Sequence, residues 1–365
     1  MDNRKHGFRG SIPLLIVEIC VLLIAVFVMY VVVTMTSEVN HKAIDEEKIL
    51  INEEIVKKKT DDVKQTETKA KKEEKVKAKG YRNIALFGVD ARDGELGRGT
   101  RSDTIMIASI NQDTQEIRLI SVFRDTYLNL SNDSYNKCNT AYAQGGPEQA
   151  INMLNMNLDL DITDYVTIGF SGLIDAVDAL GGVEIEITDA EISHLNNYQL
   201  CMAEELGVDY IPVEQSGRQL LNGMQATAYC RIRYTKGDDF RRAERQREVL
   251  RAMMDKAGGA SISTLTDMVN AVLPQVETSL DVDEILSVLG SVAGYQMVVS
   301  DGFPFEGGRA GANVGSKGSC VIPMDLEENV RQLHQMLYPE NGYAPSGQVK
   351  LINEEIKAQT GEYMQ

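Results

Sequence analysis

Hydrophobic and polar positions divide this chain into three parts. The run Ile12–Met35 contains a single charge, Glu18, and is long enough to cross a hydrocarbon core of about 30 Å. A highly charged stretch follows, with isoleucines at helical spacing. Short apolar runs and amphipathic stretches then alternate to the end of the chain, as in a folded domain. We predict a cytoplasmic tail at 1–11, a transmembrane helix at 12–36, a charged helical stalk or linker at 37–80, and an extracytoplasmic domain at 81–365.

The residues around the apolar run indicate its orientation. Arg4, Lys5 and Arg9 precede it, and basic residues beside a membrane span favour the cytoplasmic side. The run is longer than the apolar core of a secretory signal, and no Ala-x-Ala site follows it. We therefore predict an uncleaved, single-pass anchor in the cell membrane. For the stalk, a solvated spacer is favoured over a dimeric coiled coil.

Within residues 81–365, patterns typical of strands alternate with patterns typical of helices. Ile84–Val89 is a short apolar run, and two strand-like segments, Thr104–Ile110 and Glu116–Val122, are joined as in a hairpin. Further strands are predicted at Tyr165–Ile168 and Val183–Ile187. Helices are predicted at Pro147–Met156, Ser171–Leu180, Leu220–Ala228, Phe240–Lys256, Val282–Val292 and Leu326–Leu337. This order predicts the α/β class, a layered α/β/α domain with a central mixed sheet.

The distribution of charge excludes one class of partner. The net charge is −17, and residues 1–36 and 37–80 each carry +1, which leaves −19 on residues 81–365. Affinity for nucleic acid depends largely on cations that neutralise phosphates. A domain this acidic is therefore not expected to bind DNA or RNA.

Histidine and cysteine restrict the possible chemistry further. His194 and His334 are the only histidines after residue 80, so Ser-His-Asp or Cys-His catalysis has few possible bases. The domain's four cysteines show no CxxC spacing, which disfavours structural zinc. They could form two disulfides or remain free and buried. These cysteines are Cys138, Cys201, Cys230 and Cys320.

Arginines, in contrast, are concentrated. Six fall within seventeen residues of this acidic domain: Arg231, Arg233, Arg241, Arg242, Arg245 and Arg247. Arg242, Arg245 and Gln246 share one face of a predicted helix. Guanidinium groups bind phosphate oxygens in pairs. A solvated basic helix paired with neighbouring carboxylates would explain the same pattern about equally well.

Further charged residues lie where predicted strands begin or end. Asp90 follows the first strand, Arg101 and Asp103 open the second, and Arg124 closes the hairpin. Strand ends commonly meet at one edge of a sheet, where α/β proteins build their sites. Asp90 and Asp103 together suit magnesium, a hard cation that bridges carboxylate and phosphate oxygens. Salt bridges at strand ends are the alternative, but they do not require so many arginines.

These segments together resemble the LytR-CpsA-Psr family over about Asn83–Leu250. The joint order of the motifs is more specific than any one of them. The motifs are GVDAR, RSDTIMI, SVFRDT, AYAQGG, DALGGVEI, LLNGMQATAYCRIRY and DDFRRAERQREVL. The sequence departs from the family at Arg241, where a small residue is usual, and at Cys230, where an apolar residue is usual.

The resemblance implies a magnesium-dependent phosphotransferase anchored in the membrane. Such proteins hold a polyprenyl-pyrophosphate-linked glycan with its lipid in an apolar tunnel, and pass the glycan with one phosphate to a hydroxyl of peptidoglycan. Asp90 and Asp103 would bind Mg²⁺, with Mn²⁺ a possible substitute, and would form the catalytic set with Arg101 and Arg124. The pyrophosphate would be bound by Arg101, Arg124, Arg231, Arg233, Arg242, Arg245 and Gln246. Arg92, Arg233 and Arg245 are less certain members of this set, and Asp239 would orient the arginines.

Two other functions compete with this one at the sequence level. A pyrophosphatase acting on the same lipid would use the same residues with water as the acceptor. A non-catalytic envelope-binding or regulatory protein would not need Asp90 and Asp103. The sequence leaves open which polymer is moved, such as teichoic acid or capsule, which hydroxyl accepts it, which group acts as general base, and the oligomeric state.

Overall fold

The computed structural model describes residues 40–55, 80–90, 96–233, 235 and 238–363. The predicted cytoplasmic tail and transmembrane helix lie outside these ranges, as does Arg92. Within them, no helix has both the length and the apolar character needed to cross a bilayer. The topology of the anchor therefore stays a prediction.

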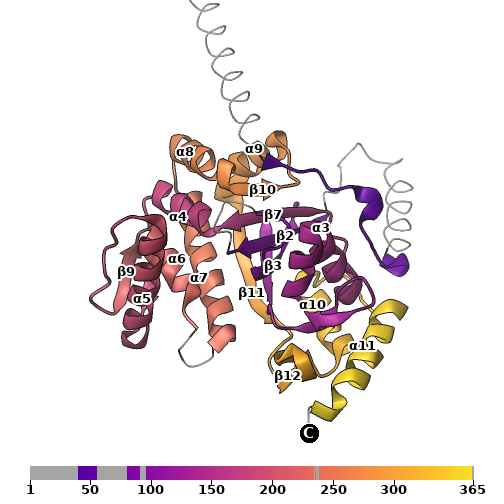
Figure 1. The fold of residues 1–365 in the computed structure, drawn as a ribbon. Helices are drawn as coiled ribbons and strands as arrows, with labels where there is room; N and C mark the ends of the chain where they lie inside the picture. Colours follow the sequence, from indigo (N-terminus) through magenta and orange to yellow (C-terminus); the bar gives the residue numbers. More distant parts are fainter. Residues whose placement is uncertain (1–39, 56–79, 91–95, 234, 236–237, 364–365) are drawn as a thin grey trace, which may run out of the picture.

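A seven-stranded sheet forms the centre of the domain (Figure 1), in the order β1-β10-β7-β2-β3-β4-β11. Three of the six neighbouring pairs are parallel, β1–β10, β2–β7 and β4–β11, and the other three are antiparallel. The predicted mixed sheet is thus confirmed. In chain order the strands are β1 Asn40–His41, β2 Tyr81–Val89, β3 Ser102–Asn111, β4 Glu116–Val122, β7 Asp164–Gly169, β10 Val276–Thr278 and β11 Gln296–Phe303.

Helices cover both faces of the sheet, as the alternation along β2 requires. Ala85, Phe87 and Val89 join the large core beneath one layer, while Leu86 packs on the opposite face with Met106. The first layer is α3 Asn139–Leu158, α10 Leu326–Leu337 and α11 Gly347–Thr360. The second is α4 Phe170–Ala179, α6 Gly223–Arg231, α7 Asp238–Gly258, α8 Ile262–Val272 and α9 Val282–Ser291. α5 Asp189–Leu206 and the ribbon β8 Val183–Ile187 with β9 Gly217–Leu221 extend the second layer (Figure 1).

Two short ribbons complete the side of the sheet that carries the first layer. One pairs β5 Tyr127–Asn129 with β6 Tyr135–Lys137, and the other pairs β12 Arg309–Asn313 with β13 Ser319–Pro323. A bridge between Thr126 and Val321 joins the two ribbons. The sequence analysis predicted none of these four strands, which have three to five residues each and lack the apolar and charged alternation of Val183–Ile187.

Two predicted helices begin three or more residues away from their predicted starts. The segment predicted as one helix at Leu220–Ala228 is split, because Asn222 and Gln225 form a reciprocal capping box that ends β9 and starts α6. Helix α3 begins at Asn139, before the predicted start, and is kinked at Gly146 (φ 69°), from which Pro147 restarts it. Neither the cap nor the kink was predicted.

Residues 40–55 differ from the helical stalk predicted for them. They form a strap that is part of the domain: β1 extends the sheet, and Ile44 and Ile49 pack against the main core. Asn152 of α3 fixes the strap by accepting from the Leu50 amide at 2.7 Å and donating to the Lys48 carbonyl at 3.0 Å. The strap contains short turns of helix at 46–48 and 53–55 rather than one continuous helix.

Asp159 holds the strap, α3 and α11 together, and its loss should destabilise the domain. Its buried carboxylate accepts hydrogen bonds from Tyr343, from the amide and hydroxyl of Ser346, and from Asn52 of the strap. Asp159→Ala would leave these donors unsatisfied, so we expect the free energy of unfolding to fall by about 2–3 kcal/mol. Urea unfolding measures it. Asp159→Asn keeps an acceptor and tolerates the left-handed backbone (φ 53°), so a loss as large as that of alanine would contradict this account.

Candidate functional site

An irregularity between β2 and β3 positions Asp103. Gly88 pairs with Thr104, but Val89 pairs with Ser102, so Asp103 is an extra residue in β3. Such bulges re-aim a side chain and are common beside sites. Ser102 is fully buried, whereas Asp103 and Thr104 both line a cavity. Gly88 permits the close approach, because a Cβ there would lie 2.8 Å from the Cβ of Thr104.

Three arginines from separate elements converge on Asp103. Arg124, just after β4, donates to Oδ1 at 2.5 Å, and Arg233, after α6, donates to Oδ2 at 3.1 Å. Arg242 of α7 donates to the main-chain oxygen of Asp103 at 3.2 Å. Asp239 lies 3.0 Å from Arg242 and 3.5 Å from Arg124. The predicted convergence of strand-end and helix charges is therefore present.

The electrostatics of this cluster favour an anion. Burial raises the pKa of Asp103, but the charges of Arg124, Arg242 and Arg233 outweigh it and hold the pKa below its ordinary value. Burial, together with the charges of Arg124 and Arg233, lowers the pKa of Arg242 to about 10. Within the described part of the chain, no hydrogen-bond acceptor reaches the buried Nε of Arg124 or Arg242. A bound anion would supply these buried donors with an acceptor.

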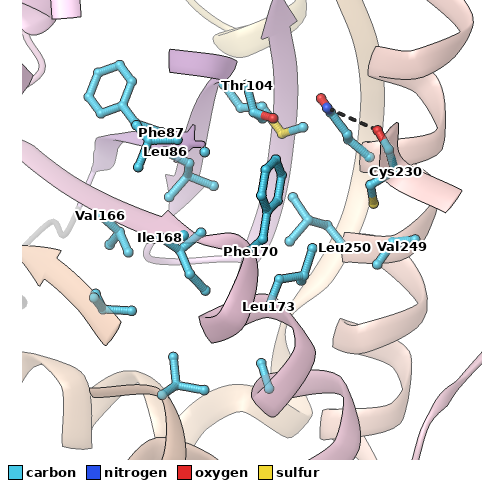
Figure 2. A pocket seen from close by; sticks show the side chains of 18 of the residues that line it. Leu86, Phe87, Thr104, Val166, Ile168, Phe170, Leu173, Cys230, Val249 and Leu250 are labelled. Atoms are coloured by element: carbon cyan, nitrogen blue, oxygen red, sulfur yellow. Dashed lines mark hydrogen bonds between the residues drawn. The ribbon is translucent and has the colours of Figure 1, made fainter. Parts of the chain in front are cut away.

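The cluster lies at one part of a mostly apolar cavity of about 560 Å³. Figure 2 shows Phe170 and Leu173 of α4 and Leu250 of α7 projecting toward the same space. The remaining apolar lining comes mainly from the strands β2, β3 and β7 and from α8, β10 and the segment between them. The charged and amide residues that line the cavity are Asp90, Asp103, Arg231, Arg233, Arg242 and Gln246. This combination suits a ligand with an anionic head and a long apolar tail.

Aromatic residues that the sequence analysis did not single out hold Arg231. Its guanidinium carbon lies 4.3 Å from the ring centroid of Phe170 and 5.6 Å from that of Tyr198, and both rings also line the cavity. Such stacking fixes a guanidinium group without neutralising it. No local motif marks these aromatics, since they lie on α4 and α5, far from Arg231 in sequence. Gln246 donates to the Cys230 carbonyl at 3.5 Å beside the same space.

Two predicted pyrophosphate ligands are placed differently. Arg245 is 1% exposed and donates to Glu191 at 2.8 Å, to the Ile232 carbonyl at 3.0 Å and to Thr235 at 2.6 Å. Its donors are thus used inside the protein, and Arg245 does not line the cavity, so its assignment to the pyrophosphate set stays a prediction that this geometry does not support. The helix-face argument failed because it could not show which buried carboxylate the face meets. Arg101 is exposed, just before β3, and does not line the cavity.

The carboxylates meet the chemical requirements for magnesium only in part. Asp90 and Asp103 line the same cavity from adjacent strands, and hard carboxylate oxygens suit Mg²⁺. The described residues contain no group of three or more His, Cys, Asp or Glu side chains able to hold a metal. Mg²⁺ usually takes one or two carboxylates and completes its shell with waters and substrate phosphates. The pair therefore fits a metal that binds together with a phosphorylated ligand.

The cysteines form no disulfide with one another. Cys138, Cys230 and Cys320 are buried and Cys201 is exposed, all as free thiols. The sequence left open either two disulfides or free thiols, and in the structure these four thiols are free. Burial raises the pKa of the Cys230 thiol to about 12, so this cavity residue stays protonated and behaves as a small apolar side chain.

Fold and site together define a mixed α/β domain whose apolar cavity carries a cluster of arginines and carboxylates. The model of the LytR_cpsA_psr family matches residues 49–315. The chain belongs to this family, as its motifs predicted.

Relatives and solved structures agree with this assignment. A polyisoprenyl-teichoic acid–peptidoglycan teichoic acid transferase TagU of Oceanobacillus iheyensis is 32% identical over 226 residues, which cover 60% of this chain and 65% of that protein. An Enterococcus faecalis structure described as a transcriptional regulator has a TM-score of 0.58 and 26% identity, and covers 78% of this chain and 96% of that one. TagT of Bacillus subtilis with bound octaprenyl pyrophosphate shares the fold, with a TM-score of 0.53 and 20% identity. The match covers 73% of this chain and 93% of TagT. The match thus spans less than two thirds of the first relative's length.

Proposed function

We propose that this protein is a membrane-anchored phosphotransferase that moves a glycopolymer, such as a teichoic acid, from a polyprenyl-pyrophosphate carrier to a hydroxyl of peptidoglycan. The observation that carries the proposal is the arginine and carboxylate cluster bordering an apolar cavity. The segment predicted at 12–36 would anchor the protein with its domain outside the cell. The TagU relatives are named for such a transfer.

In the proposed reaction, the acceptor hydroxyl attacks the phosphorus that carries the glycan. A new ester P–O bond forms, the P–O–P bridge breaks, and the polyprenyl monophosphate leaves with the electron pair. The hydroxyl proton passes to a base that we do not assign. Phosphoryl transfer requires mainly positioning and charge stabilisation, which is what several guanidinium groups in a partly buried site supply.

Each member of the cluster has a part in holding the pyrophosphate. Arg124, Arg233 and Arg242 would exchange their contacts with Asp103 for phosphate oxygens, and the Nε atoms of Arg124 and Arg242, which make no hydrogen bond to the described residues, could donate as well. Arg231 and Gln246 would complete the binding set from the cavity wall. Asp90 and Asp103 would hold Mg²⁺, which when bound neutralises charge on the phosphates. Asp239 orients Arg124 and Arg242 from the side.

The test is a product analysis with the full chain in detergent or nanodiscs, because a fragment beginning at Gly80 would lack β1 and the strap. The chain is incubated with a synthetic polyprenyl-pyrophosphoryl oligosaccharide, a wall-glycan acceptor and Mg²⁺, and products are identified by mass spectrometry. We expect acceptor-linked glycan phosphate and polyprenyl monophosphate in equal amounts. Free glycan phosphate alone would identify a pyrophosphatase instead, and unchanged substrate would favour a binding protein.

A further inference from the structure

The first described strand lies very close to the predicted anchor. The transmembrane helix is predicted to end at residue 36, and β1 begins at Asn40. Four Cα–Cα steps of about 3.8 Å connect them, so Asn40 lies within about 15 Å of the end of the anchor. A stalk that lifts the domain away from the bilayer at this point is therefore excluded by chain length.

β1 is also fixed in the domain rather than attached loosely. Asn40 and His41 pair in parallel with Glu277 and Thr278 of β10. The Lys42 amide donates to the Thr278 carbonyl at 3.0 Å, and the His41 ring lies 3.1 Å from the Ser279 carbonyl. The anchor must consequently hold the β10 edge of the sheet at the membrane surface.

One face near this edge, that of α8, carries few charges. Helix α8 leads directly through the 3₁₀ turn Leu273–Gln275 into β10, and α8, α9 and β10 lie together at one end of the molecule (Figure 1). Ile262 of α8 is 85% exposed. The other fully exposed positions of α8 and its N-cap are polar or small, and only one is charged: Ser261, Ser263, Asp267, Asn270 and Ala271.

From these observations we infer that the α8 face and β1 dock on the lipid bilayer. An exposed apolar side chain on an almost uncharged face can enter the interfacial region of a bilayer at little cost. Asp281 and Asp283, exposed at the start of α9, would be repelled by anionic headgroups, and Lys42 beside β1 would be attracted. The docking thus depends on the anchor and not on lipid charge.

This orientation turns the apolar part of the cavity toward the membrane. Met268, Val269 and Val272 of α8 line the cavity, and so do Leu273 and Val276 just after it. The arginines are contributed by α6, α7 and the segment between them. The docking rests on the proposed membrane anchor, and this step rests in addition on the proposed substrate: the polyprenyl chain enters past α8 directly from the bilayer, without crossing water.

The test measures how close labelled positions come to lipid in the full chain. A variant without the exposed and membrane cysteines, Cys20→Ala with Cys201→Ser, is reconstituted in nanodiscs, and its failure to react with dye verifies the background. Ile262→Cys then carries an environment-sensitive dye, and Leu351→Cys on α11 is the matched control, since Leu351 is also an isolated exposed apolar residue (69%). Asn270→Cys gives a second reading from α8.

We expect a lipid-borne headgroup quencher to reduce the emission from positions 262 and 270 several-fold more than that from position 351. The difference should persist in purely zwitterionic nanodiscs and in nanodiscs with added anionic lipid. Equal quenching at all three positions, or stronger quenching at 351, would overturn the inference. No glycolipid substrate is present, so the result is independent of whether the transfer reaction is found.

Discussion

Asp103→Asn should reduce glycopolymer transfer by about a hundred- to a thousandfold, the range seen when one preorganised electrostatic contact is lost. The amide keeps the size of the carboxylate but loses the charge that Arg124 and Arg233 contact at 2.5 and 3.1 Å. It would also remove one of the two proposed magnesium ligands. The transfer rate, measured with the synthetic carrier, is compared with that of Asp209→Asn, which changes an exposed carboxylate outside the cavity.

The pH dependence makes this prediction more specific. Since its arginine neighbours outweigh burial and lower the pKa of Asp103 below 3.8, the carboxylate remains charged throughout the mildly acidic range. Any loss of wild-type activity between about pH 7 and pH 5 must then arise from another group. Full activity of Asp103→Asn with a native thermal unfolding curve would show that the cluster is not the reaction centre.

The sequence predicted the parts of the fold and site that depend on periodicity and on charged residues at element ends. Leu326–Leu337 was predicted to the residue, because its apolar positions repeat at helical spacing and Asp325 caps its first turn. Asp90, Asp103, Arg231, Arg233, Arg242 and Gln246 line one cavity, with Arg124 bonded to Asp103. Their roles in binding and catalysis remain predictions.

Features that depend on contacts between distant residues were not predictable in this way. The bulge at Asp103 results from the pairing of two strands, so it cannot be predicted from the sequence of either strand alone. The strap at 40–55 is fixed by α3 and α11, more than one hundred residues later. A charged, glycine-poor segment carries no local indication that a distant asparagine will bind its backbone.

The role of Arg245 depends most clearly on a partner that is distant in the sequence, Glu191. Its guanidinium lies between α7 and the start of α5, where Glu191 is 2% exposed and also accepts from the amide and hydroxyl of Thr188. Arg245→Met should lower the free energy of unfolding by about 3–5 kcal/mol, because a buried carboxylate loses its main counter-charge. Guanidinium chloride unfolding followed by circular dichroism measures the loss.

Two comparisons distinguish this structural role from a part in pyrophosphate binding. Adding Glu191→Gln to Arg245→Met should restore much of the stability, since the uncompensated charge is gone. Burial alone would raise the pKa of Glu191, but hydrogen bonds from Thr188 and Arg245 lower it below 4.5. The stabilisation is therefore complete above that pH and is lost as the pH falls through the lowered pKa, so the gap between wild type and Arg245→Met should narrow in acid. If the Arg245→Met protein is stable but cannot bind a polyprenyl pyrophosphate, Arg245 is instead a pyrophosphate ligand.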